Sequence, residues 1–190
     1  MTSTLKVSTL QDPQNSDTAL SIDSSGRVEI KQNHTATFNY ATSGAWTFTG
    51  VPSFAKKITL VTHNLSADTQ GDIYVRVTVG GTRVMGTAYK YSEGRLSNGQ
   101  AVIVNNNAAG TDRIEVNGFN GVANLLNYIL NIYEIETNLY AFNTTVSNDT
   151  YGTFGVFHHG TITTGGPIDG FDIIASGGNL DSGKARIFWE

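Results

Sequence analysis

The chain has 190 residues, enough for one medium-sized domain with its own core, or for one domain and a small extension. It contains no cysteine, which excludes disulfide scaffolds, cysteine-ligated metal sites and cysteine nucleophiles. Charged residues make up 15% of the chain and the formal net charge is −4, which argues against a general nucleic-acid-binding protein. With 39% hydrophobic and 10% aromatic residues, the chain is also too apolar to be disordered.

The N-terminal residues MTSTLKVSTLQDPQ contain one lysine and no apolar run, so we expect no signal peptide. No segment approaches the roughly 18 apolar residues of a membrane-spanning helix, since residues 125–135 are interrupted by Asn127, Asn131 and Glu134. We therefore expect no membrane insertion, and release from a cell by a route such as lysis rather than by classical secretion.

Residues 1–33 differ in composition from the rest, because the first aromatic residue of the chain is Phe38. Leu20 and Ile22 alternate with polar residues, the sequence SSGR follows as a turn, and Val28 and Ile30 alternate again. This pattern predicts a β-hairpin whose apolar surface is too small to stand alone. We therefore divide the chain into an N-terminal β arm, residues 1–33, and a domain, residues 34–190.

Beyond residue 38 the pattern is strand, turn, strand. The clearest strand is residues 73–79, where isoleucine and valine alternate with polar or aromatic residues, and Gly80-Gly81 then predicts a two-residue hairpin loop. We expect further strands at residues 46–48, 58–62, 101–104, 113–116, 153–157 and 186–189. Turn signals separate them, including Asn105-Asn106-Asn107 and the step at Gly183. This pattern predicts an all-β protein, an antiparallel β-sandwich of jelly-roll type.

Two local expectations concern the core and the one ambiguous segment. Pro52 fixes a turn after Gly50-Val51, so Phe48 and Phe54 are expected to flank that turn and to face the core. Residues 124–138 fit a helix, with asparagine on one side, and also fit a strand that has Tyr128, Leu130 and Ile132 on one face. Strand is favoured because the asparagines and tyrosines lower helix propensity and the surrounding elements are all β.

Two clusters are candidates for a binding surface. One is the aromatic and charged group before the turn at residue 97, and its residues are Tyr89, Lys90, Tyr91 and Arg95. Aromatic faces stack on sugars or on apolar patches and basic groups add hydrogen-bond donors, but strand alternation with Tyr89 and Tyr91 on the core is the alternative. The other is His158-His159, for which a solvated loop is favoured over a metal site, because adjacent residues of a strand point to opposite faces.

The acidic residues offer no recognisable catalytic pair. Glu134 and Glu136 share one face of a strand, and Asp169 and Asp172 meet only in a tight turn. No nucleophile, phosphate-loop, dinucleotide or calcium-loop motif is present. We therefore expect no enzymatic activity, no metal and no cofactor.

Three segments resemble small structural and tail-fibre proteins of tailed bacteriophages, especially those of marine phages. They are STLKVSTLQ with ALSIDSSGRVEI near the N-terminus, FTGVPSFAKKITLVTHNLSADTQGDIYVRVTVGG at residues 48–81, and the C-terminal FDIIASGGNLDSGKARIFWE. Residues 82–170 carry no such match.

The resemblance implies a virion structural protein that is assembled in the host cytoplasm and released by lysis. It also implies a homotrimer and an arm that docks on other virion proteins. The docking candidates are the apolar residues of the arm, namely Leu5, Val7, Leu20, Ile22, Val28 and Ile30. A host surface glycan is a further candidate partner of the projecting domain.

Three functions remain open from the sequence. A tail fibre or tail appendage is favoured, because the block at residues 48–81 resembles tail proteins. A capsid decoration protein would use the same arm to clamp the head shell. A free lectin-like carbohydrate-binding module is the alternative from another class.

Overall fold

The computed structural model describes residues 9–11, 18–22, 25, 28–30, 35–36, 44–69, 71–97, 100–117, 125–148 and 154–190. The chain divides into two compact units, Met1–Asn33 and His34–Glu190. This division falls at the boundary that the composition predicts.

The first unit contains a three-stranded antiparallel sheet. Its strands are β1 (Thr9–Gln11), β2 (Thr18–Ile22) and β3 (Val28–Ile30), in the order β1-β2-β3. Leu20 pairs with Ile30 and Ile22 pairs with Val28, which confirms the hairpin predicted from the alternation in this segment. Leu5 and Val7 lie outside the described residues.

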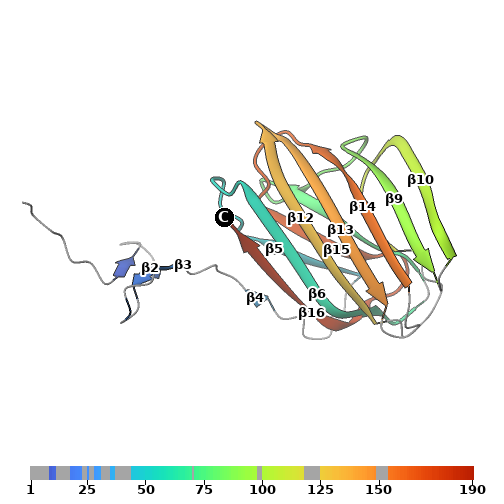
Figure 1. Ribbon diagram of the computed structural model, residues 1–190, viewed down its shortest axis with the longest axis horizontal. Helices are drawn as coiled ribbons and strands as arrows, with labels where there is room; N and C mark the ends of the chain where they lie inside the picture. The colour runs from blue at the N-terminus through green and yellow to red at the C-terminus, as the bar shows by residue number, and fades with distance from the viewer. Residues whose placement is uncertain are drawn as a thin grey trace, which may run out of the picture. The chain divides into compact units, whose positions relative to one another are not determined.

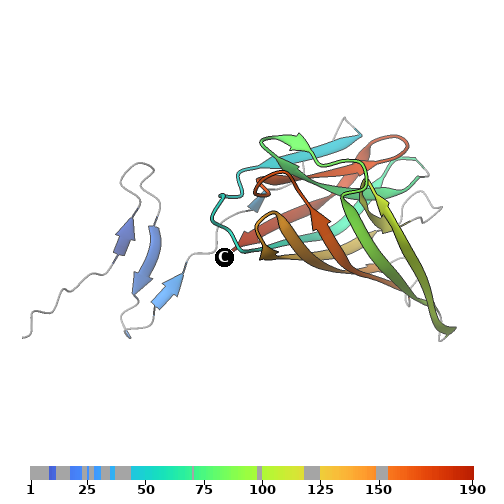
Figure 2. The ribbon, with the colours of Figure 1, turned by 90° about the horizontal axis from the view of Figure 1, so that it is seen from above.

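The second unit is an antiparallel β-sandwich, as the sequence predicts, and Figures 1 and 2 show its two layers. The larger sheet has the order β10-β9-β14-β13-β12-β6-β16-β4. Its strands are β4 (Thr35–Ala36), β6 (Lys57–Ala67), β9 (Tyr89–Ser97), β10 (Gln100–Thr111), β12 (Leu126–Glu136), β13 (Leu139–Asn148), β14 (Phe154–Thr163) and β16 (Leu180–Trp189).

The smaller sheet has the order β11-β7-β15-β5, with β8 paired to β7. Its strands are β5 (Ala45–Thr49), β7 (Ile73–Val79), β8 (Thr82–Arg83), β11 (Ile114–Asn117) and β15 (Gly170–Ala175). The hairpin between β7 and β8 turns at Gly80 and Gly81, both with positive φ, which confirms the predicted two-residue loop.

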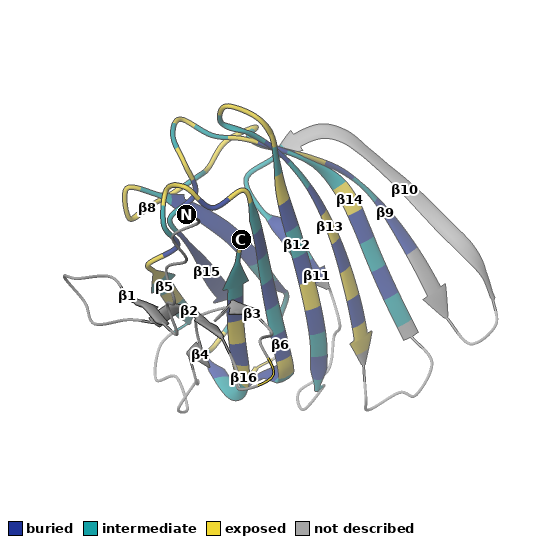
Figure 3. Ribbon diagram, turned by 60° about the vertical axis from the view of Figure 1, so that its left-hand side comes forward, coloured by how far each residue is buried: buried dark blue, intermediate teal, exposed yellow. Residues whose placement is uncertain are grey.

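The hydrophobic core lies between the two sheets and takes the inward faces of strands such as β6, β7 and β12. In β7, Ile73, Val75 and Val77 are buried in the core, as their alternation predicts. Phe48 and Trp189 are only partly buried and pack against the edge of the core. The alternation appears as bands of buried and exposed residues along β6, β12, β13 and β14 in Figure 3.

The ambiguous segment is a strand. β12 pairs with β6 on one side and with β13 on the other, and Tyr128, Leu130 and Ile132 are fully buried. Ile129 and Tyr133 point to the opposite face and are exposed. Strand pairing on both sides satisfies the backbone of this asparagine-rich segment without a helix.

Three of the local predictions about turns are wrong. The Phe54 side chain is 70% exposed, because Val51 and Ala55 fill the core at this turn instead. Residues 105–107 do not form a turn, because they pair with β9 and β10 continues through them. Gly183 lies inside β16, where the register with β6 shifts, and its φ of 130° marks a bulge rather than a turn before the last strand.

Among the described residues, the structure contains no helix long and apolar enough to cross a membrane.

Candidate functional site

The predicted aromatic cluster lies on β9, and its side chains alternate between the core and the surface. Tyr89 and Tyr91 are 0% and 5% exposed, so interpreting them as contact residues of a surface patch is wrong. Lys90, between them, points outward and is exposed. Arg95 belongs to the same strand, but its side chain lies outside the described residues.

The two adjacent histidines lie in strand β14 rather than in a solvated loop, and their side chains point to opposite faces of the sheet. His158 is 2% exposed and points into the core, whereas His159 is exposed on the outside. The His158 Nε2 atom lies 3.5 Å from the Glu93 carboxylate, and its Nδ1 atom lies 2.8 Å from the Thr144 hydroxyl. The Tyr91 ring meets the imidazole edge-on, with ring centroids 5.1 Å apart. His158 is therefore a structural residue that cannot contact a surface ligand.

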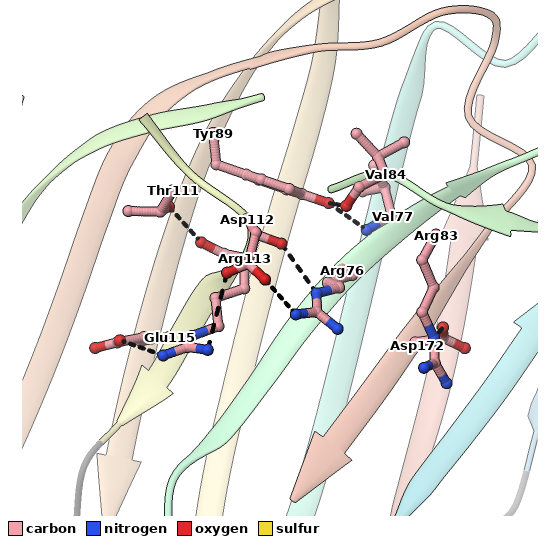
Figure 4. Close-up of polar contacts among 10 residues, drawn as sticks. All are labelled: Arg76, Val77, Arg83, Val84, Tyr89, Thr111, Asp112, Arg113, Glu115 and Asp172. Carbon is pink, nitrogen blue, oxygen red and sulfur yellow. Dashed lines mark hydrogen bonds and ion pairs between the residues drawn. The ribbon is translucent and has the colours of Figure 1, made fainter. Parts of the chain in front are cut away.

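The Tyr89 hydroxyl completes the backbone hydrogen bonding of β7. It accepts a hydrogen bond from the Val77 N–H at 2.9 Å and donates one to the Val84 carbonyl at 3.2 Å, as Figure 4 shows. Burial raises the pKa of the Tyr89 phenol, and burial also raises the pKa of Tyr91 to about 12. Both phenols are therefore neutral hydrogen-bonding groups of the core.

The exposed candidates, Lys90 and His159, lie on one surface of the sandwich. We call it the outer face: the side chains of β6, β12, β13, β14 and β9 that point away from the smaller sheet. His159 lies beside Asn143 of β13, and Asn143 lies beside Asn131 of β12. The outer face therefore brings together residues as distant in the sequence as Lys90 and His159.

A row of polar side chains crosses the middle of the outer face. This polar row consists of Thr59, Asn131, Asn143 and His159, which follow one another in strand register. The Thr59 hydroxyl donates to Asn131 Oδ1 at 3.0 Å, and Asn131 Nδ2 donates to Asn143 Oδ1 at 3.0 Å. These bonds fix the orientation of two amide groups on an open surface.

Two rows that mix apolar or aromatic residues with polar ones flank the polar row, one on each side. The tyrosine row contains Lys57, Tyr133, Ala141, Thr161 and Lys90. The phenylalanine row contains Val61, Ile129, Thr145, Phe157 and Gly94. Ile129 and Tyr133 are 42% and 38% exposed, so the outer face offers apolar surface next to oriented amides.

Sequence reasoning missed Thr59, Asn131 and Asn143. The alternation of β12 indicates that Asn131 points away from the core once the segment is taken as a strand. It does not indicate which residues of β6 and β13 lie beside Asn131, because that depends on the pairing register of strands distant in the sequence.

The smaller sheet carries a cluster of charged side chains on its own outward surface. Arg76 donates from Nε to the Asp112 carbonyl at 3.0 Å and forms an ion pair with the Asp112 carboxylate. The Arg113 guanidinium also forms ion pairs: its Nη1 atom lies 3.8 Å from Asp112 Oδ1 and its Nη2 atom lies 3.7 Å from Glu115 Oε1 (Figure 4). The Tyr74 ring lies near both Arg76 and Arg113, with its centroid 5.1 and 4.9 Å from the two guanidinium carbons. These charges pair with one another, so the cluster is a structural network.

Three of the four acidic residues considered from the sequence make contacts within the fold. Glu134 forms an ion pair with Lys56. Asp169 accepts hydrogen bonds from the Thr78 hydroxyl and the Gly81 N–H, and so fixes the β7–β8 hairpin. Asp172 is buried and forms an ion pair with Arg83. Within the described part of the chain, no group of three or more histidine or acidic side chains is arranged to hold a metal ion.

Comparison with known proteins gives little further information. No family model matches the sequence, and no curated protein matches it. Among solved structures, a tetrameric galectin from the ball sponge Cinachyrella sp. is similar over 76% of this chain and 98% of that chain. The identity is 11% and the TM-score is 0.33, and a likeness at this level carries no argument about a ligand or an assembly.

Proposed function

We propose that this chain is a non-enzymatic structural protein of a tailed-phage virion, a tail fibre or tail appendage that attaches to the host through the outer face of its larger sheet. The sequence resemblance of its first, middle and last segments to phage tail proteins supplies the virion context. The observation that carries the binding role is the outer face itself, where a hydrogen-bonded polar row lies between rows that contain exposed Ile129 and Tyr133.

The outer face suits binding because its polar groups are oriented before any ligand arrives. The Asn131 amide is held from one side by Thr59 and donates to Asn143 on the other. Side chains that are already ordered lose less entropy on binding, so affinity is retained for the contacts themselves.

In this proposal the first unit attaches the chain to the virion. Residues 1–33 dock on neighbouring virion proteins, with Leu20, Ile22, Val28 and Ile30 of β2 and β3 as the apolar contacts, and three copies of the chain assemble together. The small apolar content of this unit supports the idea, because a sheet with so few apolar residues is stabilised by packing on a partner.

Competition with phage adsorption tests the proposal. Purified full-length protein should bind host cells and reduce phage adsorption, and the double variant Asn131→Ala with Asn143→Ala should lose both effects. Thr49→Ala, an exposed polar position on β5 of the smaller sheet, is the matched control and should behave like the wild type.

A capsid decoration protein would give the opposite pattern. Cell binding would be absent, electron microscopy would place the protein on the head shell, and capsids without it would lose resistance to heat. That result would overturn the tail-appendage proposal.

A further inference from the structure

The side chain of Phe157 lies across the backbone of Gly94 on the outer face. The two residues face each other in the register of β14 and β9. A Cβ atom placed on Gly94 would come within 2.2 Å of Phe157 Cε2 and 2.5 Å of Cζ. The ring therefore occupies the space that any other residue at position 94 would need, and it covers a glycine that is buried without a side chain of its own.

This contact gives the ring a fixed position. One part of it rests on the β9 strand, and the side chain as a whole is half-buried. Part of the Phe157 side chain is therefore exposed on the outer face, and we call this exposed part the platform.

The polar row lies directly beside this platform. Phe157 and His159 are two residues apart on β14, and so are Thr145 and Asn143 on β13, their partners in register. Side chains two residues apart on one strand are roughly 7 Å apart, and neighbouring strands are about 4.8 Å apart. By these spacings the His159 and Asn143 side chains lie roughly 7–9 Å from the platform, a span that one sugar ring together with its hydroxyl groups can bridge.

The orientation of the Asn143 amide strengthens the argument. Its Oδ1 atom accepts the hydrogen bond from Asn131 Nδ2, so its own NH₂ group is directed away from β12, with two N–H donors. His159 adds a ring that can donate or accept. The polar row offers amide, hydroxyl and imidazole groups rather than carboxylate or ammonium groups, which suits the hydroxyl groups of a ligand.

We propose that Phe157, Asn143 and His159 form a subsite for a neutral saccharide. A pyranose ring places its apolar C–H face on the Phe157 platform, and its hydroxyl groups bind the Asn143 amide and the His159 imidazole. Sites of this kind pair apolar or aromatic surface with a few oriented polar groups. The inference rests on the proposed function, because the subsite is part of the face by which the appendage attaches.

The contact between Phe157 and Gly94 also has a purely structural explanation, since an aromatic ring across a strand glycine stabilises the pair. The experiment must separate the two roles. Phe157→Leu keeps apolar cover over Gly94 and removes the flat ring, whereas Phe157→Tyr keeps the ring.

The test is titration of the ¹⁵N-labelled full-length protein with maltose, lactose, cellobiose and N,N′-diacetylchitobiose. Binding should shift the side-chain NH₂ signal of Asn143. Phe157→Leu and Asn143→Ala should each weaken binding of the responding disaccharide by about tenfold, a loss of ~1.4 kcal/mol. Phe157→Tyr and the control Thr49→Ala should bind like the wild type, and melting temperatures verify that every variant is folded.

Either of two results would overturn the subsite. One is that none of these disaccharides shifts the Asn143 signal at millimolar concentration. The other is that binding persists in both Phe157→Leu and Asn143→Ala.

If disaccharides bind as expected but the protein does not compete with phage adsorption, the subsite stands and the appendage function fails. If adsorption is blocked and no saccharide binds, the appendage function stands and the subsite fails.

Discussion

The Tyr89 hydroxyl lies 2.9 Å from the Val77 nitrogen and takes the place of a neighbouring strand. On this side of β7, β11 pairs as far as Val75 and β8 pairs from Thr78 onward. The Val77 N–H falls in the gap between those two partners. A tyrosine in the core therefore supplies the acceptor that β7 would otherwise lack.

Tyr89→Phe should lower the free energy of unfolding by about 1–3 kcal/mol, because it leaves the Val77 N–H buried without its acceptor. Tyr128→Phe is the matched control, since the Tyr128 hydroxyl is buried and has no hydrogen-bond partner among the described residues. That change should be neutral or slightly stabilising. Urea denaturation of both variants measures the difference, and equal destabilisation would contradict the role given to Tyr89.

Adjacent residues of β12 provide a test of the assigned faces. Leu130 is fully buried between the sheets, and Ile129 is 42% exposed on the outer face. Leu130→Ala should lower the free energy of unfolding by about 2–5 kcal/mol. Ile129→Ala should change it by less than about 1 kcal/mol. The reverse order in chemical denaturation would show that β12 has the opposite face on the core.

The fold class and several strands follow from the sequence because they depend on local pattern. The alternation at residues 73–79 and the pair Gly80-Gly81 fix a strand and its hairpin without any distant contact. Residues 105–107 show the limit of this reasoning. Three consecutive asparagines favour a turn locally, but pairing with β9 overrides that preference.

The candidate site was only partly predictable. His158 and His159 are the same residue type side by side, so alternation predicts that they face opposite ways but not which one faces the core. In the structure His158 shares the buried face of β14 with Val156 and Ile162, and the Glu93 side chain that it meets comes from a strand far away in the sequence. The polar row depends in the same way on the register among β6, β12, β13 and β14, which no local pattern encodes.

The contact between His158 and Glu93 predicts a strong coupling inside the core. Both side chains are almost fully buried, and Nε2 and Oε2 are 3.5 Å apart. Glu93→Ala removes a buried polar neighbour of the His158 imidazole, so it should cost about 1–3 kcal/mol of stability.

The exposed Glu136→Ala serves as the control for that prediction and should cost little. A double-mutant cycle with His158→Ala measures the coupling directly. Costs that simply add in the double variant would show that the two side chains do not interact.

The buried tyrosines predict loss of stability in alkali. Burial raises the pKa of Tyr91 to about 12 and raises the pKa of Tyr128 and Tyr89 as well. In the unfolded chain these phenols titrate near pH 10. Above about pH 10 the unfolded state therefore releases protons that the folded state keeps, so the free energy of unfolding falls as the pH rises toward the folded-state pKa values.

Urea denaturation at a series of pH values from neutral to about 11 should show this decline. Tyr128→Phe should make the decline shallower, because it removes one of the buried phenols. A stability that stays constant across this range would show that the phenols are accessible to solvent in the folded protein.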